Sequence, residues 1–440
     1  MLWRQPTGGP RLARRVLLPM LLLLLLRPLA ARGQYVLQDA YDKKRYDPGF
    51  LVLPYAFYTP SQRFGGGFVW DSTGLLQPQS DSFVLAFGDI NNTYGIQGGT
   101  DDFQLKPIDR LFVGTQFGIY RYNFDRLYIN GPIAFPHQSA GTNDSSDDNF
   151  ISRRYNDNWA NVEFKYLLPI GGGRDTVINR YLLENGIVHS GQTGGHGWNP
   201  FTTGRTYLTV TPFLEYRTID NRAGDRRVDE NGLRFGVLYD NTDFPLNPSS
   251  GNLSRFVISR DFGWFDSSNP WTNVAAEYAQ YFDLGRSKLF RQQVIAMDFW
   301  TSYSLTWSQV NVGGRRQVFD GPPFYDGATL GGSTRFRGYP DNRFWDRAAV
   351  YMDAELRLTP VWNPLGQIGI LKKADLTWMQ FVIFGEIGRV GPEYSGNLFS
   401  HLKGDAGFGI RLLANDTVVR FDIAASNEQF GIWAGLSQPF

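Results

Sequence analysis

A glycine-rich segment late in the chain places an arginine between two aromatic rings. The segment Leu330–Tyr339 (LGGSTRFRGY) lies between two stretches predicted to be long β-strands, and it ends in Phe336, Arg337, Gly338 and Tyr339. A guanidinium can bind a carboxylate through two parallel hydrogen bonds, which fixes orientation as well as distance. Gly338 permits a tight turn, and Tyr339 can pack its ring while its hydroxyl donates a hydrogen bond. These residue types indicate a loop pinned by carboxylates; the alternative is an arginine in solvent.

The strand that follows this loop has one apolar face and one charged face. Its apolar side carries Val350, Met352, Ala354, Leu356 and Leu358, and its polar side carries Tyr351, Asp353, Glu355 and Arg357. This alternation is typical of a membrane β-barrel, in which one face of each strand meets lipid and the other a wet lumen. We therefore expect the loop to fold into the lumen.

Catalytic and metal-binding patterns are absent from the sequence. The histidines are His137, His189, His196 and His401, none at metal-ligand spacing, and the chain has no cysteine. It contains no Gly-x-Ser-x-Gly nucleophile elbow, and residues 171–174 lack the Lys-Ser/Thr of a phosphate loop. We predict no catalysis, no metal and no cofactor.

The first 33 residues have the pattern of a cleaved export signal. Four arginines precede the apolar run 16–26, and Ala31 and Gly33 supply small residues before the predicted cleavage site. A membrane anchor is the alternative, but the run is short against the roughly 20 residues of a spanning helix. Removing the six arginines of residues 1–33, which hold no acid, leaves 43 − 6 = 37 basic and 42 acidic residues. A charge of about −5 argues against nucleic acid as a partner.

The rest of the chain predicts a single all-β domain. Mean hydropathy is −0.30 and aromatic residues make up 15% of the chain, a combination typical of membrane β-barrels. Residues 34–50 are predicted to be a short periplasmic segment and residues 51–440 an antiparallel barrel. At roughly 24 residues per strand and connection, 16 strands fit, with 14 or 18 as alternatives. The last five strands are expected at 348–358, 376–388, 405–414, 417–425 and 429–440.

Two other readings of this region remain open. A soluble β-sandwich is an alternative to the barrel, although a sandwich of this length would need several domains and the sequence shows no linker between them. Residues 175–186 are compatible with a short helix.

The end of the chain resembles the recognition signal of Gram-negative outer-membrane proteins. Phe430, Ile432, Ala434, Leu436 and Phe440 are expected on one lipid-facing side. We assign Trp433, Leu436 and Phe440 to a C-terminal assembly signal read by the host barrel-assembly machinery. Because an open strand edge in lipid leaves backbone groups unsatisfied, the last strand is expected to pair with the first.

These features together resemble the BamA/TamA superfamily of outer-membrane barrels, also called the bacterial surface antigen family. Phe336-Arg337-Gly338-Tyr339 is similar to the family's Arg-Gly-aromatic tip on its sixth extracellular loop. The segment from Phe384 to Gly388 (FGEIG) is similar to a strand motif of the family that carries aspartate where this chain has Glu386. The chain resembles the branch of bare barrels without periplasmic POTRA domains.

The resemblance implies a 16-stranded barrel whose sixth loop folds back into the lumen. Arg337 would then pair with Glu386, and Glu355 on the preceding strand is a second candidate. The strand phase agrees, because Glu386 lies opposite the apolar side chains of Ile383 and Ile387.

Three functions follow as hypotheses. The first is an outer-membrane module whose first-to-last strand seam opens to help proteins or lipids insert or cross. The second is a passive or plugged pore, and the third is a barrel that anchors a partner protein. Expected partners are outer-membrane lipid, the assembly machinery during biogenesis, and other outer-membrane proteins or further copies of the chain.

Overall fold

The structure is a computed structural model that describes residues 35–39, 49–59, 63–129, 135, 137–220, 225–312, 315–367, 376–414 and 417–440. The predicted export signal, residues 1–33, lies outside the described residues. No helix in the described part is long and apolar enough to cross a membrane.

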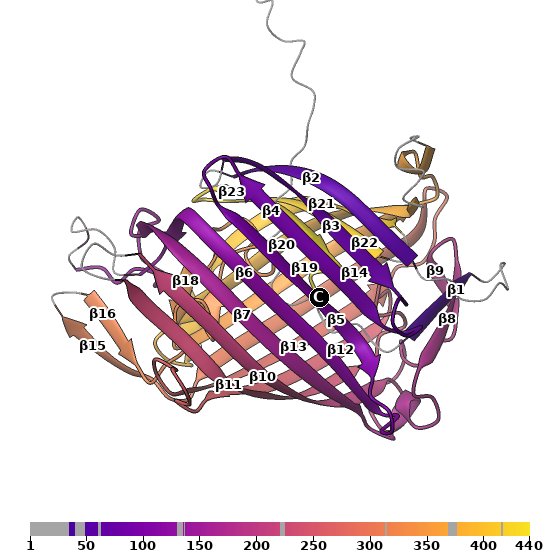
Figure 1. Cartoon of the computed structure of the whole chain (residues 1–440). Coiled ribbons are helices and arrows are strands. Elements are labelled where there is room, and N and C mark those ends of the chain that lie inside the picture. The colour runs from indigo at the N-terminus through magenta and orange to yellow at the C-terminus, as the bar shows by residue number, and fades with distance from the viewer. Residues whose placement is uncertain are drawn as a thin grey trace, which may run out of the picture.

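Sixteen strands form one antiparallel sheet that curls into a barrel (Figure 1). In spatial order they are β2 (Gly49–Thr59), β3 (Arg63–Thr73), β4 (Asp81–Asp89), β5 (Tyr94–Gln104), β6 (Leu111–Leu127), β7 (Ile151–Leu167), β10 (Arg205–Ile219), β11 (Arg226–Asp240), β12 (Gly251–Asp261), β13 (Trp271–Asp283), β14 (Phe290–Ser304), β19 (Ala348–Pro360), β20 (Leu376–Gly391), β21 (Lys403–Ala414), β22 (Thr417–Ser426) and β23 (Phe430–Leu436). The predicted strand number is confirmed, and each of the last five strands begins within two residues of its predicted start, but the final strand ends at Leu436 and not at Phe440.

Within the described residues, seven shorter strands and three short 3-10 helices lie outside this sheet. They are β1 (Tyr35–Asp39), β8 (Asn179–Glu184), β9 (Ile187–Ser190), β15 (Ser308–Val312), β16 (Arg315–Phe319), β17 (Ala328–Leu330), β18 (Phe344–Asp346), η1 (Gly171–Gly173), η2 (Leu365–Gln367) and η4 (Gly396–Phe399). We call the rim of the barrel beside β1 the terminal rim and the opposite rim the loop rim.

Period-two alternation decides which side of each strand faces outward. On β20, Ile383 is 55% exposed, whereas Glu386 on the inward side is fully buried. The same outward exposure recurs at Leu208, Val237, Phe256, Met297, Met352, Phe408 and Ile423. An apolar outer belt around a polar interior is the pattern of a barrel surrounded by lipid.

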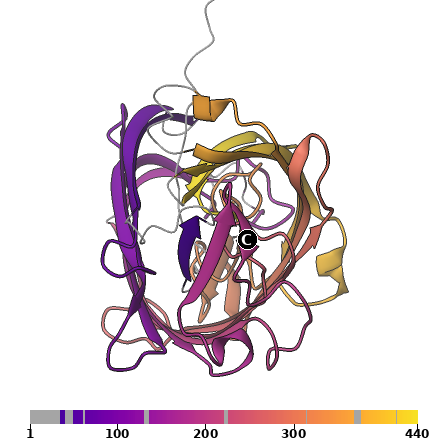
Figure 2. The same cartoon turned by 90° about the vertical axis from the view of Figure 1, so that its right-hand side faces the viewer.

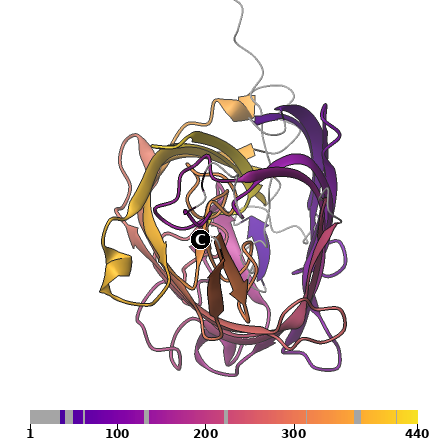
Figure 3. The ribbon, with the colours of Figure 1, turned by 90° about the vertical axis from the view of Figure 1, so that its left-hand side faces the viewer.

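The connection between β14 and β19, residues 305–347, enters the barrel. We call it the inward loop. The hairpin of β15 and β16 extends beyond the loop rim, while the rest of the connection lies within the ring of strands (Figures 1 and 3). The sequence predicted this inward path.

A small sheet crosses the opposite mouth and was not predicted. Its order is β1-β8-β9, with β1 parallel to β8, and Figure 2 shows β1 and β8 across the opening at the terminal rim. We call these three strands the cap sheet. Tyr181 and Leu183 of β8 pack in one buried cluster with Trp378 and Leu413 of the wall, and the Trp378 indole donates to the Gly186 carbonyl.

The cap sheet corrects two expectations. The helix expected within residues 175–186 is wrong, because this segment forms β8 and its turn. Residues 34–50 were predicted only as a short segment before the barrel, yet residues 35–39 form a strand, and β2 begins at Gly49, two residues before the predicted boundary.

The two ends of the large sheet overlap instead of pairing. The strand order ends at β2 and β23, and their described residues share no backbone register. Ala434 and Leu436 on the outward side of β23 are only 1% and 4% exposed, and they share a buried apolar cluster with Leu51 of β2 and Val69 of β3. The expected pairing of the first and last strands is therefore not found. We call this overlap the seam.

The last four residues turn into the lumen. Ser437 has a φ of 68°, which redirects the chain after β23. The ring of Phe440 stacks on Tyr281 of β13 at 6.2 Å, and the guanidinium of Arg357 lies 4.9 Å from its centroid. The chain end lies inside the ring in Figures 2 and 3. The expectation that Phe440 faces lipid with Phe430 and Ile432 is therefore wrong, since period-two phase ends where the strand ends.

A charge placed on the outer belt tests the membrane-facing side. We expect Ile383→Arg to destabilise the barrel in lipid vesicles by about 2–4 kcal/mol, because the guanidinium would sit in hydrocarbon. Urea unfolding followed by tryptophan fluorescence measures the change. Phe265→Arg is the matched control, since Phe265 is 89% exposed in the turn after β12. Equal stability of the two variants would contradict the assignment of this face.

Candidate functional site

The guanidinium of Arg337 lies in the lumen among four carboxylates. Its side chain and those of all four acids have no exposed area. Nη2 lies 2.6 Å from Asp353 and Nη1 lies 2.8 Å from Glu355, both on β19. Nε lies 3.2 Å from Glu386 on β20, and Nη1 lies 3.2 Å from Asp422 on β22. The structure thus places Arg337 against Glu386 and Glu355, and its fork is shared among several acids instead of binding one.

The wall strands alone would hold like charges opposite one another. In the strand register Asp353 faces Glu386, and Glu386 faces Asp405 of β21. Like charges directly opposite on neighbouring strands are destabilising. The backbone amide of Arg337 donates to Glu386 at 2.8 Å, and that of Gly338 donates to Asp405 at 2.7 Å. The loop therefore supplies one cation and two N–H donors to a row of three acids.

Three wall arginines complete the charge network. Arg357 contacts Glu355 at 2.8 Å, Arg411 contacts both Glu355 and Asp422, and Arg420 lies 3.7 Å from Asp422. With Arg337 they set four cations against five carboxylates. Because burial makes an unpaired charge costly, this network is stable only while every member keeps its partners.

The three residues around Arg337 lock the loop backbone. Phe336 has a φ of 62°, a region that non-glycine residues rarely adopt, and its ring packs on Tyr351 at 5.7 Å. A Cβ added to Gly338 would lie 2.7 Å from the Asp405 side chain, so only glycine fits. The Tyr339 hydroxyl lies 3.1 Å from the Gly404 carbonyl, to which it donates, and 3.0 Å from the Asn427 side chain.

The strand motif on β20 forms the floor of this site. The ring of Phe384 lies 3.5 Å from the Arg337 guanidinium carbon, the geometry of a cation–π contact. A Cβ on Gly388 would lie 2.5 Å from the Val350 carbonyl and 3.3 Å from the Phe336 ring. Phe384 and Gly388 therefore shape the space that the Phe336 ring and the guanidinium fill.

The inward loop has a second attachment, on the opposite wall, that sequence reasoning missed. Arg217 of β10 stacks on the Tyr325 ring at 3.7 Å and pairs with Asp157 and Glu215. Asp326 pairs with Arg234 of β11 at 3.1 Å. The loop is therefore held on both sides of the lumen, not by Arg337 alone.

The seam touches the site directly. Trp433 of β23 donates its indole N–H to the Arg337 carbonyl, and a Cβ on Gly431 would lie 2.4 Å from the same oxygen. Trp433 and Leu436 lie on opposite sides of β23, facing the lumen and the overlapping strands respectively. Movement of the last strand would therefore disturb the loop backbone at Arg337.

Asp353 and Asp422 were not among the partners predicted for Arg337. Both side chains face the lumen; Asp353 lies on the polar side of its strand that the alternation identified, two residues from Glu355. The period-two alternation predicts which side of each strand these acids lie on. Which of them contact Arg337 depends on the three-dimensional position of the inward loop, which the sequence does not show.

Comparison with known proteins gives a family and a group of similar structures. A family model described as the Omp85 superfamily domain matches residues 117–433. No match was found among curated proteins. Similar solved structures include BamA from Haemophilus ducreyi lacking POTRA domains 1–3, at 12% identity and TM-score 0.48, covering 89% of this chain and 70% of that one.

Two further structures are CdiB proteins, each with a TM-score of 0.48. CdiB from Acinetobacter baumannii is 12% identical over 90% of this chain and 60% of that one. CdiB from Escherichia coli is 10% identical over 88% and 62%. This chain thus spans less than two thirds of either CdiB chain.

Removal of Arg337 tests the charge network. We expect Arg337→Ala to lower the free energy of unfolding by about 3–5 kcal/mol, because it leaves buried carboxylates without their shared cation. Glu386→Ala should resemble it, and the double variant should cost less than the sum of the two. Urea unfolding in lipid vesicles measures all three.

The matched control is Arg335→Ala, two residues away in the same loop. Arg335 is 25% exposed and pairs with Glu277 at 3.2 Å, so its loss should cost only about 1 kcal/mol. Strict additivity of Arg337→Ala and Glu386→Ala would show that the two residues do not interact.

Proposed function

The chain belongs to the Omp85 superfamily, and on that premise we propose that it helps other proteins insert into or cross the outer membrane through its seam. Omp85 barrels are bacterial outer-membrane proteins that act as transporters or assembly factors. The supporting observation is that the two ends of the sheet overlap through apolar side chains and share no described backbone ladder.

The free energy needed to open a seam closed by overlapping strands differs from that needed to open a seam closed by paired strands. Separating paired strands in lipid would leave a row of N–H and C=O groups unsatisfied. Here the contact to be broken is the buried apolar cluster that holds Ala434 and Leu436 together with Leu51 and Val69, along with the hydrogen bond from Thr417 to Asp71 of β3. The strand edges of β2 and β23 then become templates on which an incoming strand can pair.

The site at Arg337 would act as a latch on this seam. The Arg337 carbonyl accepts a hydrogen bond from the Trp433 indole, while its guanidinium forms ion pairs with acids on β19, β20 and β22. β23 is therefore tied to a loop that the barrel wall holds by buried charge. We propose that Phe336–Tyr339 keep the last strand in its inward position until an incoming polypeptide displaces it.

A plugged barrel is the second candidate, and one observation favours it. The inward loop is attached to both walls, and the cap sheet packs against the wall at the other mouth. Such a barrel would be structural, with a lumen that stays closed.

A disulfide across the seam separates the two candidates. Asp71→Cys with Thr417→Cys replaces two hydrogen-bonded side chains, and the natural chain has no cysteine to interfere. If the seam must open, the oxidised variant should fold but lose its effect on outer-membrane protein levels, and reduction should restore it. Quantitative proteomics of the envelope, against a strain lacking the gene, gives the measurement.

The control disulfide lies within the continuous sheet. Thr100 and Thr115 on β5 and β6 have hydroxyl oxygens 3.1 Å apart, so Thr100→Cys with Thr115→Cys cross-links neighbours without touching the seam. Full activity with the seam disulfide formed would contradict seam opening.

Conductance in planar bilayers tests whether the inward loop closes the lumen. We expect little conductance from the wild type, because the loop spans the lumen between two attachments. Arg337→Ala combined with Tyr325→Ala removes the main contact on each wall while Asp326–Arg234 remains, so it should loosen the loop and produce larger and noisier channels. A large, stable conductance in the wild type would contradict a closed lumen.

A further inference from the structure

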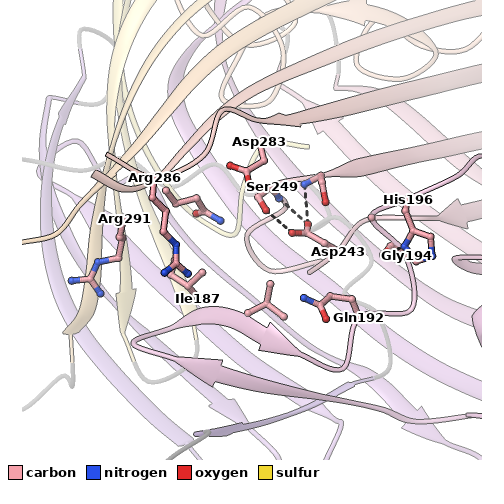
Figure 4. Close-up of a pocket in the computed structure, with 13 residues that line it drawn as sticks. Ile187, Gln192, Gly194, His196, Asp243, Ser249, Asp283, Arg286 and Arg291 are labelled. Carbon is pink, nitrogen blue, oxygen red and sulfur yellow. Dashed lines mark hydrogen bonds between the residues drawn. The ribbon is translucent and has the colours of Figure 1, made fainter. Parts of the chain in front are cut away.

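A pocket of about 440 Å³ lies at the terminal rim, beside the cap sheet. Ile187 and Val188 of β9 line one side, and Asp243, Asp283, Arg286 and Arg291 line the other (Figure 4). The residues come from β9, the β11–β12 turn, the end of β13, the β13–β14 turn and the start of β14. A volume of this size is within the range of sites that bind small ligands or short peptide segments.

The pocket borders a free strand edge. β9 is the last strand of the cap sheet, and within the described residues its ladder is only with β8. A free edge presents unpaired backbone donors and acceptors to any extended chain beside it. Ile187 and Val188 add apolar contact at the same place.

The cap sheet already accepts an extended segment at its other edge. β1, a five-residue strand remote in sequence, pairs in parallel with β8 from Tyr35↔Asn179 to Asp39↔Leu183. Tyr35 packs its ring against Tyr181 at 5.7 Å. The sheet is therefore built by strand addition on one side, and β9 offers the equivalent edge on the other.

Among the described residues that line the pocket, Arg286 is the arginine without a hydrogen-bond or ion-pair partner. Asp243 accepts hydrogen bonds from Phe244, Ser249 and Ser250, and Asp283 accepts one from Gly285. Arg291 donates to the carbonyls of Pro360 and Val361. Arg286 is exposed and takes part in no hydrogen bond or ion pair within the described part of the chain.

We propose that this pocket binds an extended peptide that adds as a strand to the free edge of β9 and places a carboxylate on Arg286. The backbone ladder would supply affinity, and the arginine would select segments with an aspartate, a glutamate or a free C-terminus at that position. The inference rests on the proposed function for the source of the peptide, which is the polypeptide that the barrel handles. It gives the terminal rim a capture site within the barrel chain itself.

The test is fluorescence anisotropy with the whole barrel in detergent micelles. The probe is a labelled peptide of alternating valine and serine that ends in aspartate. We expect saturable binding to the wild type and a loss of at least about tenfold in affinity with Arg286→Glu, since a hydrogen bond between charged groups is removed. Lys288→Glu is the matched control, because Lys288 is exposed in the same turn but does not line the pocket.

A second probe tests the backbone ladder. The same peptide with alternate N-methylated residues keeps its charge but cannot pair as a strand, so it should lose binding. Equal binding of the N-methylated peptide, or full competition by inorganic phosphate alone, would overturn the proposal in favour of a plain anion site. No saturable binding of the original peptide, or equal loss with Lys288→Glu, would overturn it as well.

These results stand apart from those on the seam. If the peptide fails to bind while the seam disulfide still abolishes assembly, the capture site is wrong and the proposed function remains. A cysteine at Gln192, which also lines the pocket, should cross-link to a cysteine-bearing probe, and exclusive cross-linking elsewhere would contradict the location.

Discussion

The structure depends on one buried cation. Arg337 has no exposed area and lies among acids from three strands, and without it Asp353, Glu386 and Asp405 would face one another across the wall. Neither the loop nor the wall is satisfied alone, because each holds charge that the other must pair. The loop backbone lies very close to the barrel wall. This close approach accounts for the positive φ of Phe336 and for glycine at positions 338 and 388.

The same arginine links the lumen to the edge of the sheet. Its carbonyl binds Trp433, so the inward position of β23 and the position of the loop are held by one residue. An overlapped seam needs such a link, since apolar packing has little directionality and a backbone ladder does not fix the register of β2 and β23. Burial of Ala434 and Leu436 keeps the contact dry, and the latch determines where the last strand lies.

The sequence predicted what periodicity and charge determine. Alternation indicated the barrel and the inward face of Glu355 and Glu386, the chain length and the family resemblance gave 16 strands, and the glycine-rich loop identified Arg337. Periodicity could not show what covers the outward face of a strand, so Leu436 and Phe440 were both expected to face lipid. Leu436 instead shares a buried cluster with residues of β2 and β3, and Phe440 lies in the lumen. β1 and the Tyr325 attachment were missed because both rest on contacts between segments remote in sequence.

Native-state hydrogen exchange at the loop backbone tests the central claim most directly. The amides of Arg337 and Gly338 donate to buried carboxylates, so they should exchange as slowly as those of β19, opening only with the barrel itself. In the Arg337→Ala variant, the Gly338 amide should exchange far faster than it does in the wild type. Exchange in the wild type as fast as in the exposed strand β15 would show that the loop leaves the wall freely, and the latch would be refuted.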